Sequence, residues 1–273
     1  FHVSETLLEQ GSGPVNEDAV YADDQRCVVC DGATSLDRSR ASGNSNKTTG
    51  GQQAAAITAA AFASELDLVD SARTANKMIR ERMIASRVDF SRRESLWSTS
   101  FAAVEIHEGS IDWCQIGDCM ILVVYDDGRS ERLTGLPGQD AQVLKTWQRI
   151  GLQSHGTIHQ VLADKIASVR RSMNRNFGVL NGEDEAMTFV SHGTIDTDHI
   201  TDILLFSDGL FPPSSNPERP FADDIFVALY QKGGVRKVRD HVRSLQQEDP
   251  GCYRYPRFKM FDDIGAIALK KSG

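Results

Sequence analysis

Apolar positions along the chain occur in short runs and periodic stretches that predict strands and helices in separate blocks. Residues 26–30 form an apolar run that ends at Asp31-Gly32, which is typical of a strand entering a turn. Residues 51–66 are rich in Ala and repeat their apolar positions at helical spacing, and residues 69–88 show the same period. The small Ala side chains favour helices that lie close against a sheet.

The middle of the chain predicts two consecutive β-hairpins. Residues 98–106 and 110–116 flank one turn that contains Gly, and residues 120–125 and 129–133 flank an Asp-Asp-Gly turn. Hairpins connect antiparallel strands, so this block predicts an antiparallel sheet rather than a doubly wound parallel one.

The last third adds elements of both kinds. We expect strands at residues 187–191, 202–206 and 264–269, and helices at residues 221–231 and 235–246. The order of strands, helices, antiparallel strands, helices and strand predicts an α+β fold, in which helices cover both outer faces of the sheets.

Domain organisation is predicted to be simple. No convincing linker interrupts the pattern, so we expect one domain over residues 1–273. Between the middle and late strands, residues 138–150 and 158–171 predict polar helices or a mobile insertion.

Composition and charge exclude several classes of protein. The 273 residues carry a formal net charge of -8, which disfavours a nucleic-acid partner. No apolar run approaches the roughly 20 residues that span a bilayer, so we expect no membrane partner. The five Cys are odd in number and irregularly spaced, and the N-terminus shows no signal-peptide pattern. These features predict reduced thiols and a cytoplasmic protein.

Acidic residues recur where apolar runs begin or end. Five segments share this design, namely Asn16-Glu17-Asp18, Asp31-Gly32, Gly117-Asp118, Asp208-Gly209 and Asp262-Asp263. Each segment alone fits an ordinary turn, because Asp-Gly is a common turn dipeptide. Repetition at strand ends favours a shared site, since a rigid sheet can direct several carboxylates to one point. Carboxylate oxygens suit hard cations such as Mg²⁺ and Mn²⁺.

The order of these segments resembles the PP2C (PPM) family of metal-dependent serine/threonine protein phosphatases. The matching segments are Asn16-Glu17-Asp18-Ala19, Asp31-Gly32, Gly50-Gly51, Ser98-Thr99-Ser100, Gly117-Asp118, Ser207-Asp208-Gly209 and Asp262-Asp263. The resemblance covers essentially the whole chain. It implies a four-layer α/β/β/α sandwich of two antiparallel sheets flanked by helices. It also implies a flap at residues 139–171, for which a packed pair of surface helices is the alternative.

The resemblance implies a site for two Mn²⁺ or Mg²⁺ ions, with a ligand set of Asp31, Gly32, Asp208 and Asp262. The Asp31 carboxylate would bridge the two ions, and the Gly32 carbonyl would bind one of them. Glu17 and Asp18 would hold metal-bound waters, and Asp118 matches a third, weaker metal position. The implied reaction is hydrolysis of phosphoserine or phosphothreonine in a phosphoprotein by a metal-bridged hydroxide that attacks phosphorus in line.

Two positions depart from the family pattern. The Arg that grips the substrate phosphate is replaced by Gly13, and the general-acid His of some members is replaced by Ala33. Arg38, Arg40 and Lys47 are candidates for the replacement cation. Two alternatives therefore stay open: a small-molecule phosphoesterase, and a metal-binding pseudophosphatase that serves as a partner-binding module. Because every metal position is retained, we predict an active enzyme.

Overall fold

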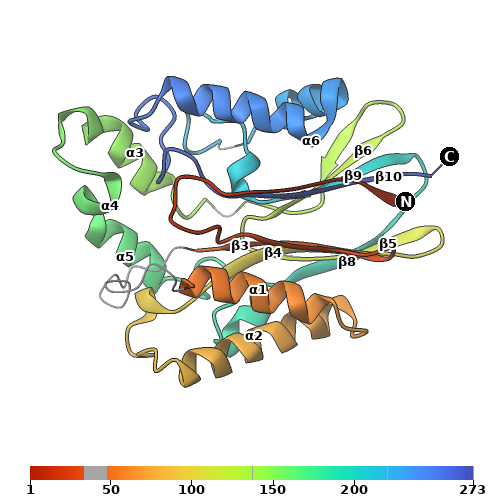
Figure 1. Cartoon of the computed structure of the whole chain (residues 1–273), viewed down its shortest axis with the longest axis horizontal. Coiled ribbons are helices and arrows are strands. Elements are labelled where there is room, and N and C mark those ends of the chain that lie inside the picture. The colour runs from red at the N-terminus through yellow and green to blue at the C-terminus, as the bar shows by residue number, and fades with distance from the viewer. Residues whose placement is uncertain (34–47, 137, 220, 273) are drawn as a thin grey trace.

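Two five-stranded sheets stack face to face in the computed structural model, which describes residues 1–33, 48–136, 138–219 and 221–272 (Figure 1). The first sheet has the order β1 (His2–Glu9), β10 (Ile264–Lys270), β9 (Ile200–Phe206), β6 (Met120–Tyr125) and β7 (Ser130–Arg132). The second sheet has the order β2 (Ala19–Ala22), β3 (Arg26–Gly32), β4 (Thr99–Ile106), β5 (Ser110–Ile116) and β8 (Ser191–Asp196). All of these strand pairs are antiparallel, as predicted.

Helices cover the outer face of each sheet, so the predicted four-layer sandwich is confirmed (Figure 1). The second sheet packs against α1 (Gly50–Phe62) and α2 (Leu68–Ala85), and the first sheet packs against α6 (Asp223–Glu248). α6 is kinked at Gly233 and Gly234, where the backbone is not helical. The two helices predicted at residues 221–231 and 235–246 are the two arms of this kinked helix.

Strand β3 shows how the sequence pattern builds the layers. Cys27 and Val29 pack between the sheets, whereas Val28 and Cys30 pack under the helices. Successive side chains of a strand point to opposite faces, so a strand buried on both faces is apolar at consecutive positions. The two Cys of this strand therefore face different cores, and all five Cys of the chain are buried free thiols.

One predicted strand is wrong. Residues 187–191 were expected to be extended, but Asp184–Phe189 form the 3-10 helix η4, and β8 begins only at Ser191. The apolar residues of η4 pack into the core beneath α2, with Ala186 completely buried. Periodicity alone cannot distinguish a short buried helical turn from a strand.

Short helices form a separate layer at one end of the sandwich (Figure 1). They are α3 (Ala141–Ile150), η3 (Gly151–Gln153), α4 (Ile158–Val161) and α5 (Ala163–Arg171). We call this layer the flap segment. It has its own apolar cluster, which includes Val143, Trp147, Ile158, Leu162 and Ile166. Within the described residues, no helix combines the length and the apolar character needed to cross a membrane.

The remaining elements of the described residues are two single-turn 3-10 helices. The first, η2 (Arg93–Ser95), precedes β4, and the second, η5 (Asp208–Leu210), follows β9. η5 begins with Asp208, one of the predicted metal ligands, so the end of β9 positions a residue of the site.

Candidate active site

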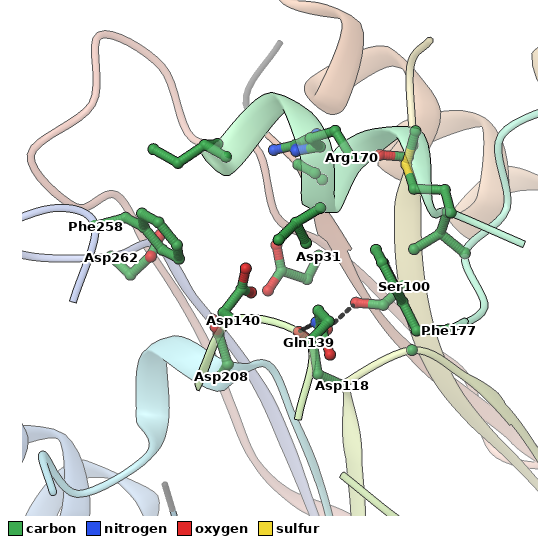
Figure 2. Close-up of a pocket in the computed structure, with 18 of the residues that line it drawn as sticks. Asp31, Ser100, Asp118, Gln139, Asp140, Arg170, Phe177, Asp208, Phe258 and Asp262 are labelled. Carbon is green, nitrogen blue, oxygen red and sulfur yellow. Dashed lines mark hydrogen bonds between the residues drawn. The ribbon is translucent and has the colours of Figure 1, made fainter. Parts of the chain in front are cut away.

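Four carboxylates from separate strand ends line one cavity of about 140 Å³. Asp31 lies near the end of β3, Asp118 lies between β5 and β6, Asp208 follows β9, and Asp262 precedes β10. Figure 2 shows these side chains converging on the same space. The structure therefore brings together the side chains that the sequence singled out at the strand ends.

The end of β3 reaches the start of α1 through glycine. A Cβ atom on Gly32 would lie 2.4 Å from the Gly51 carbonyl oxygen, so no other residue fits without displacing the backbone. The Gly32 N–H donates to the Glu17 carbonyl oxygen at 3.1 Å. The close approach of β3, α1 and the β1–β2 loop places Gly32 at the wall of the cavity.

Glu17 and Asp18 are buried next to this cluster, and hydroxyl groups hold both carboxylates. Thr49, the N-cap of α1, donates its Oγ1 hydrogen to Glu17 Oε1 at 2.5 Å. Ser207 Oγ donates to Asp18 Oδ2 at 2.6 Å. These bonds fix the two carboxylates from the β1–β2 loop against α1 and β9.

Asp118 connects the sheets to the flap segment. It follows Gly117, whose φ of +81° favours glycine, and a Cβ there would lie 2.4 Å from Ser100 Cβ. Ser100 Oγ donates to Asp118 Oδ1 at 2.8 Å, and Gln139 Nε2 donates to Oδ2 at 3.3 Å. Ser100 is also the cross-strand partner of Asp31, so the two predicted ligand positions share a neighbour.

The segment before β10 contains two acids with different surroundings. Asp263 Oδ1 accepts from Gly11 N at 2.7 Å, and its Oδ2 accepts from Glu17 N at 2.9 Å. It therefore ties the β1–β2 loop to β10. Asp262 lines the cavity and forms an ion pair with Lys259 Nζ at 2.7 Å.

The buried carboxylates repel one another. Burial raises the pKa of Asp31 well above its usual range, and Asp18, Asp118 and Asp262 raise it further. Burial likewise raises the pKa of Asp208, with Asp31 as the largest charged contributor and a hydrogen bond between the two side chains. Like charges confined in a water-poor site need a cation, a shared proton or both.

Burial also raises the pKa of Asp18. Its hydrogen bond from Ser207 opposes this shift, and the nearby Asp262 charge reinforces it. Repulsion between the carboxylates thus extends from the cavity to Asp18 in the β1–β2 loop.

The donor set fits divalent cations. Carboxylate oxygens and one backbone carbonyl are the ligands that Mg²⁺ and Mn²⁺ prefer, and the excess of buried negative charge favours a bound cation. No three His, Cys, Asp or Glu side chains of the described residues already stand at coordinating distances from a common point. Asp262 is instead paired with Lys259 Nζ. Binding an ion through Asp262 would require this side chain to move away from its present partner.

The flap segment lines the cavity through Arg170, which lies across it from Asp118 and Asp208 (Figure 2). Gln139 and Asp140, just before α3, also line the cavity, on the side of Asp118 and Asp208. The family resemblance implied a flap at residues 139–171, but it did not single out these three side chains. Burial raises the pKa of Asp140 to about 6, the Asp118 charge adds to the rise, and the Arg170 charge opposes it. No local motif marks these residues, since their position depends on how the flap helices pack.

Lys259 is a further cavity residue that the sequence did not predict. Burial alone would lower its pKa, but the charges of Asp262 and Asp263 raise it above its ordinary value. Lys259 precedes Asp262 by three residues, and this spacing could have predicted an ion pair between them, because a loop can fold a side chain back over that distance. The candidate cations Arg38, Arg40 and Lys47 lie outside the described residues.

A second cavity of about 160 Å³ adjoins the first and shares Asp118, Asp208 and Asp262 with it. Its lining includes the apolar side chains of Leu136, Leu144, Phe211, Pro212, Tyr255 and Pro256. The carboxylate cluster therefore borders two cavities, and apolar side chains contribute to the lining of both.

Solved structures with the same fold include several bacterial phosphatases. The catalytic domain of the serine/threonine protein phosphatase PstP, in complex with two manganese ions, is 16% identical, with a TM-score of 0.59 over 97% of this chain and 96% of that one. Stp1 of Staphylococcus aureus is 16% identical, with a TM-score of 0.58 over 100% and 96%. MsPP of Mycobacterium smegmatis, in complex with cacodylate, is 18% identical, with a TM-score of 0.56 over 100% of both chains. These likenesses establish the fold.

A search of the curated proteins gives no match. The family model described as "Protein phosphatase 2C" matches residues 9–245, which is most of the chain and includes all the strand-end carboxylates except Asp262. The predicted resemblance is thereby confirmed, and the chain belongs to the protein phosphatase 2C family.

Proposed function

We propose that this protein phosphatase hydrolyses phosphoserine and phosphothreonine in proteins, with two Mn²⁺ or Mg²⁺ ions held in the carboxylate-lined cavity. Family membership identifies the chain as a protein phosphatase of a family that uses divalent metals. The observation that carries the finer proposal is the convergence of four carboxylates on one cavity, with burial that disfavours the charged forms of Asp31 and Asp208.

The proposed ligands come from three strand ends. Asp31 would bridge the two ions and the Gly32 carbonyl would bind one of them, while Asp208 and Asp262 would bind the other. When bound, the ions lower the pKa of water toward neutrality and offset charge on the phosphoryl oxygens. The PstP structure with two manganese ions supports this stoichiometry.

Loading of the site would change the ion pair of Lys259. Its ammonium now lies 2.7 Å from Asp262 Oδ1 and 3.9 Å from Asp263 Oδ2. A bound ion would displace Lys259 from Asp262, and Asp263 is close enough to keep the ammonium paired.

Three further acids would support the reaction. Glu17 and Asp18, held by Thr49 and Ser207, would accept hydrogen bonds from water at the site and so orient it. Asp118, whose carboxylate accepts a hydrogen bond from Ser100 Oγ, would contribute to a third, weaker metal position.

The second cavity favours a protein substrate over a small ester. A phosphate ester without flanking residues would fill only the first cavity, beside the carboxylates. The adjoining second cavity, which has apolar side chains in its lining, offers space for a side chain next to the phosphoresidue. We therefore expect peptides to be hydrolysed with higher kcat/KM than p-nitrophenyl phosphate.

Turnover assays test the proposal directly. The wild-type protein is assayed on a phosphopeptide panel and on p-nitrophenyl phosphate, each with Mn²⁺ and with EDTA. We expect Mn²⁺-dependent hydrolysis that EDTA abolishes, a preference for peptides, and loss of activity in Asp208→Asn. Equal turnover of generic esters and peptides would favour a small-molecule phosphoesterase.

Calorimetry separates the enzyme from a binding module. A pseudophosphatase would bind Mn²⁺ without hydrolysing any phosphoester, whereas the proposed enzyme shows both properties. Asp208→Asn should weaken Mn²⁺ binding while its thermal unfolding stays cooperative. Wild-type turnover in that variant would reject Asp208 as a metal ligand.

A further inference from the structure

The loop that would carry the usual phosphate-binding cation has no basic side chain. Residues 10–16 contain no Lys, Arg or His. The loop is also closed on itself, because Gln10 Nε2 donates to the Gly13 carbonyl oxygen at 2.8 Å. Ser12 Oγ donates to the Phe261 carbonyl oxygen at 2.9 Å and holds the loop against the segment before β10. A cation for the substrate phosphate must therefore come from another element.

Among the described residues that line the first cavity, three have basic side chains, namely His159, Arg170 and Lys259. Lys259 already neutralises the carboxylate of Asp262 and lies beside that of Asp263. The His159 ring lies against Phe258, with ring centroids 5.8 Å apart. Arg170 projects from α5, on the side of the cavity opposite Asp118 and Asp208 (Figure 2).

The surroundings of Arg170 keep its guanidinium at the cavity wall. Its Nη1 atom is shielded from solvent. Burial lowers the pKa of Arg170, and the charges of Asp140, Glu17 and Asp31 oppose that shift. A guanidinium stays protonated in proteins, so this side chain is a fixed positive charge facing the carboxylate cluster.

Contacts on both sides of Arg170 in the sequence hold helix α5 in place. Ile166, one turn earlier, packs into the apolar cluster of the flap segment. Arg93, from η2 under the second sheet, donates to the Arg171 carbonyl oxygen at 3.2 Å and also to that of Met173. The sandwich therefore fixes the end of the helix from which Arg170 projects.

We propose that Arg170 binds the phosphoryl group of the substrate from the flap side and so replaces the cation that the β1–β2 loop lacks. Two parallel N–H groups of a guanidinium match two oxygens of a phosphate. A phosphoryl group between Arg170 and the ion-binding carboxylates would be contacted from opposite sides. This inference rests on the proposed function and names the residue that grips the phosphate in it.

Phosphate binding to the metal-loaded protein tests the role of Arg170. Calorimetry with inorganic phosphate is done on Mn²⁺-saturated wild type, Arg170→Ala, Arg170→Lys and Arg171→Ala. Arg171 is the matched control, because it is the next residue of the same helix, carries the same charge and has an exposed side chain. We expect Arg170→Ala to weaken phosphate binding about ten- to hundredfold, the scale of one charged hydrogen-bonded contact. Arg170→Lys should recover part of the loss, and Arg171→Ala should bind like wild type.

Two further measurements separate this role from a structural one. Mn²⁺ affinity in the absence of phosphate should not fall in Arg170→Ala, because the variant removes a positive charge that faces the ion site, and thermal unfolding should stay cooperative. With a phosphopeptide, KM and the inhibition constant of phosphate should rise in this variant and be partly restored in Arg170→Lys.

The outcomes also distinguish the inference from the proposed function. Wild-type protein without Mn²⁺-dependent hydrolysis would reject the function itself. An active wild type together with an Arg170→Ala variant of unchanged KM and phosphate affinity would reject only the role of Arg170. Equal losses in Arg170→Ala and Arg171→Ala would also overturn it, because the effect would then be general electrostatics.

Discussion

The two walls of the active-site cavity are built in different ways. The wall that holds Asp31, Asp118 and Asp208 consists of strand ends whose positions are fixed by antiparallel ladders. The wall that holds Arg170 consists of short helices outside those ladders. The proposed ion site is therefore part of the sandwich core, whereas the proposed phosphate contact depends on a peripheral layer of short helices.

The support behind each wall differs in the same way. Behind the carboxylates lie large apolar clusters between the sheets and under the helices. The flap helices α3, α4 and α5 have only 10, 4 and 9 residues and share one small cluster. Helices of this length are marginal alone, so their geometry relies on tertiary packing.

The largest expected effect lies on the strand-end wall. Asp31→Asn keeps the side-chain shape but removes the charge proposed to bridge both ions. We expect kcat/KM on a phosphopeptide to fall at least about a thousandfold, because both ions contribute to transition-state charge stabilisation. Steady-state kinetics with saturating Mn²⁺ measures the loss, and calorimetry should show weakened Mn²⁺ binding.

The stability of the same variant provides its control. Removing one of several repelling buried carboxylates should leave the metal-free protein at least as stable as wild type. Denaturant unfolding in EDTA measures this. A strongly destabilised Asp31→Asn would mean that the carboxylate has a structural role, and the lost activity could not be assigned to ion binding.

The contrast between the walls matches what the sequence could predict. Asp31 and Asp208 each follow an apolar run and precede Gly, so local pattern predicted both the strand and the acid at its end. The family resemblance then predicted that the segments meet. Arg170 carries no such signal, because its helix position says nothing about which surface α5 packs against.

Short apolar segments mark the limit of the fold prediction. The pattern at residues 187–191 could not distinguish a strand from the 3-10 helix η4 that packs beneath α2. The domain prediction over residues 1–273 and the flap role of residues 139–171 stay predictions. Both predictions can be tested by measuring whether the flap segment unfolds separately from the rest of the chain.

A pair of core substitutions tests that separation. Phe206 is almost completely buried in the first sheet and stacks on Phe226 of α6, with ring centroids 4.4 Å apart. Trp147 is similarly buried, but in the flap cluster. We expect Phe206→Ala to lower the free energy of unfolding of the whole chain by about 3–5 kcal/mol. Trp147→Ala should leave global unfolding near wild type and weaken the flap segment alone.

Hydrogen exchange resolves the two responses. In Trp147→Ala, the amides of α3 and α5 should lose protection while those of β3 and β9 keep it. Phosphate binding should weaken as well, because Arg170 loses its support. If Trp147→Ala instead destabilised the whole chain as much as Phe206→Ala, the two walls would form one cooperative unit and the contrast drawn between them would be wrong.

Asp118 joins the walls and should give a smaller effect. Its carboxylate accepts from Ser100 on β4 and from Gln139 beside the flap helices. Asp118→Asn should reduce kcat about a hundredfold while leaving the affinity for the first two Mn²⁺ ions near wild type, as a weaker third position implies. Mn²⁺ titration by calorimetry beside turnover assays checks this, and equal losses of binding and turnover would place Asp118 in the main ion site.

The smallest expected effect concerns the loop that carries Lys259 between the walls. Asp249 accepts from Tyr253 N at 3.0 Å, Tyr255 N at 2.9 Å and Arg257 Nη1 at 3.0 Å. Burial alone would raise the pKa of Asp249, but these hydrogen bonds outweigh it and lower the pKa below its ordinary value. Asp249→Asn should cost about 1 kcal/mol of unfolding free energy at pH 7, the scale of a net hydrogen bond.

The pH dependence of that cost identifies its origin. Because the folded pKa of Asp249 is lowered, its contribution is fully present above the unfolded pKa of about 3.9 and is lost as pH falls through the folded value. Denaturant unfolding should therefore show a constant difference between wild type and Asp249→Asn from pH 7 to about pH 5, and a shrinking one below about pH 4. A difference that persists at low pH would show that the amide disturbs the packing of the loop, and that the charge of Asp249 does not hold Lys259 in position.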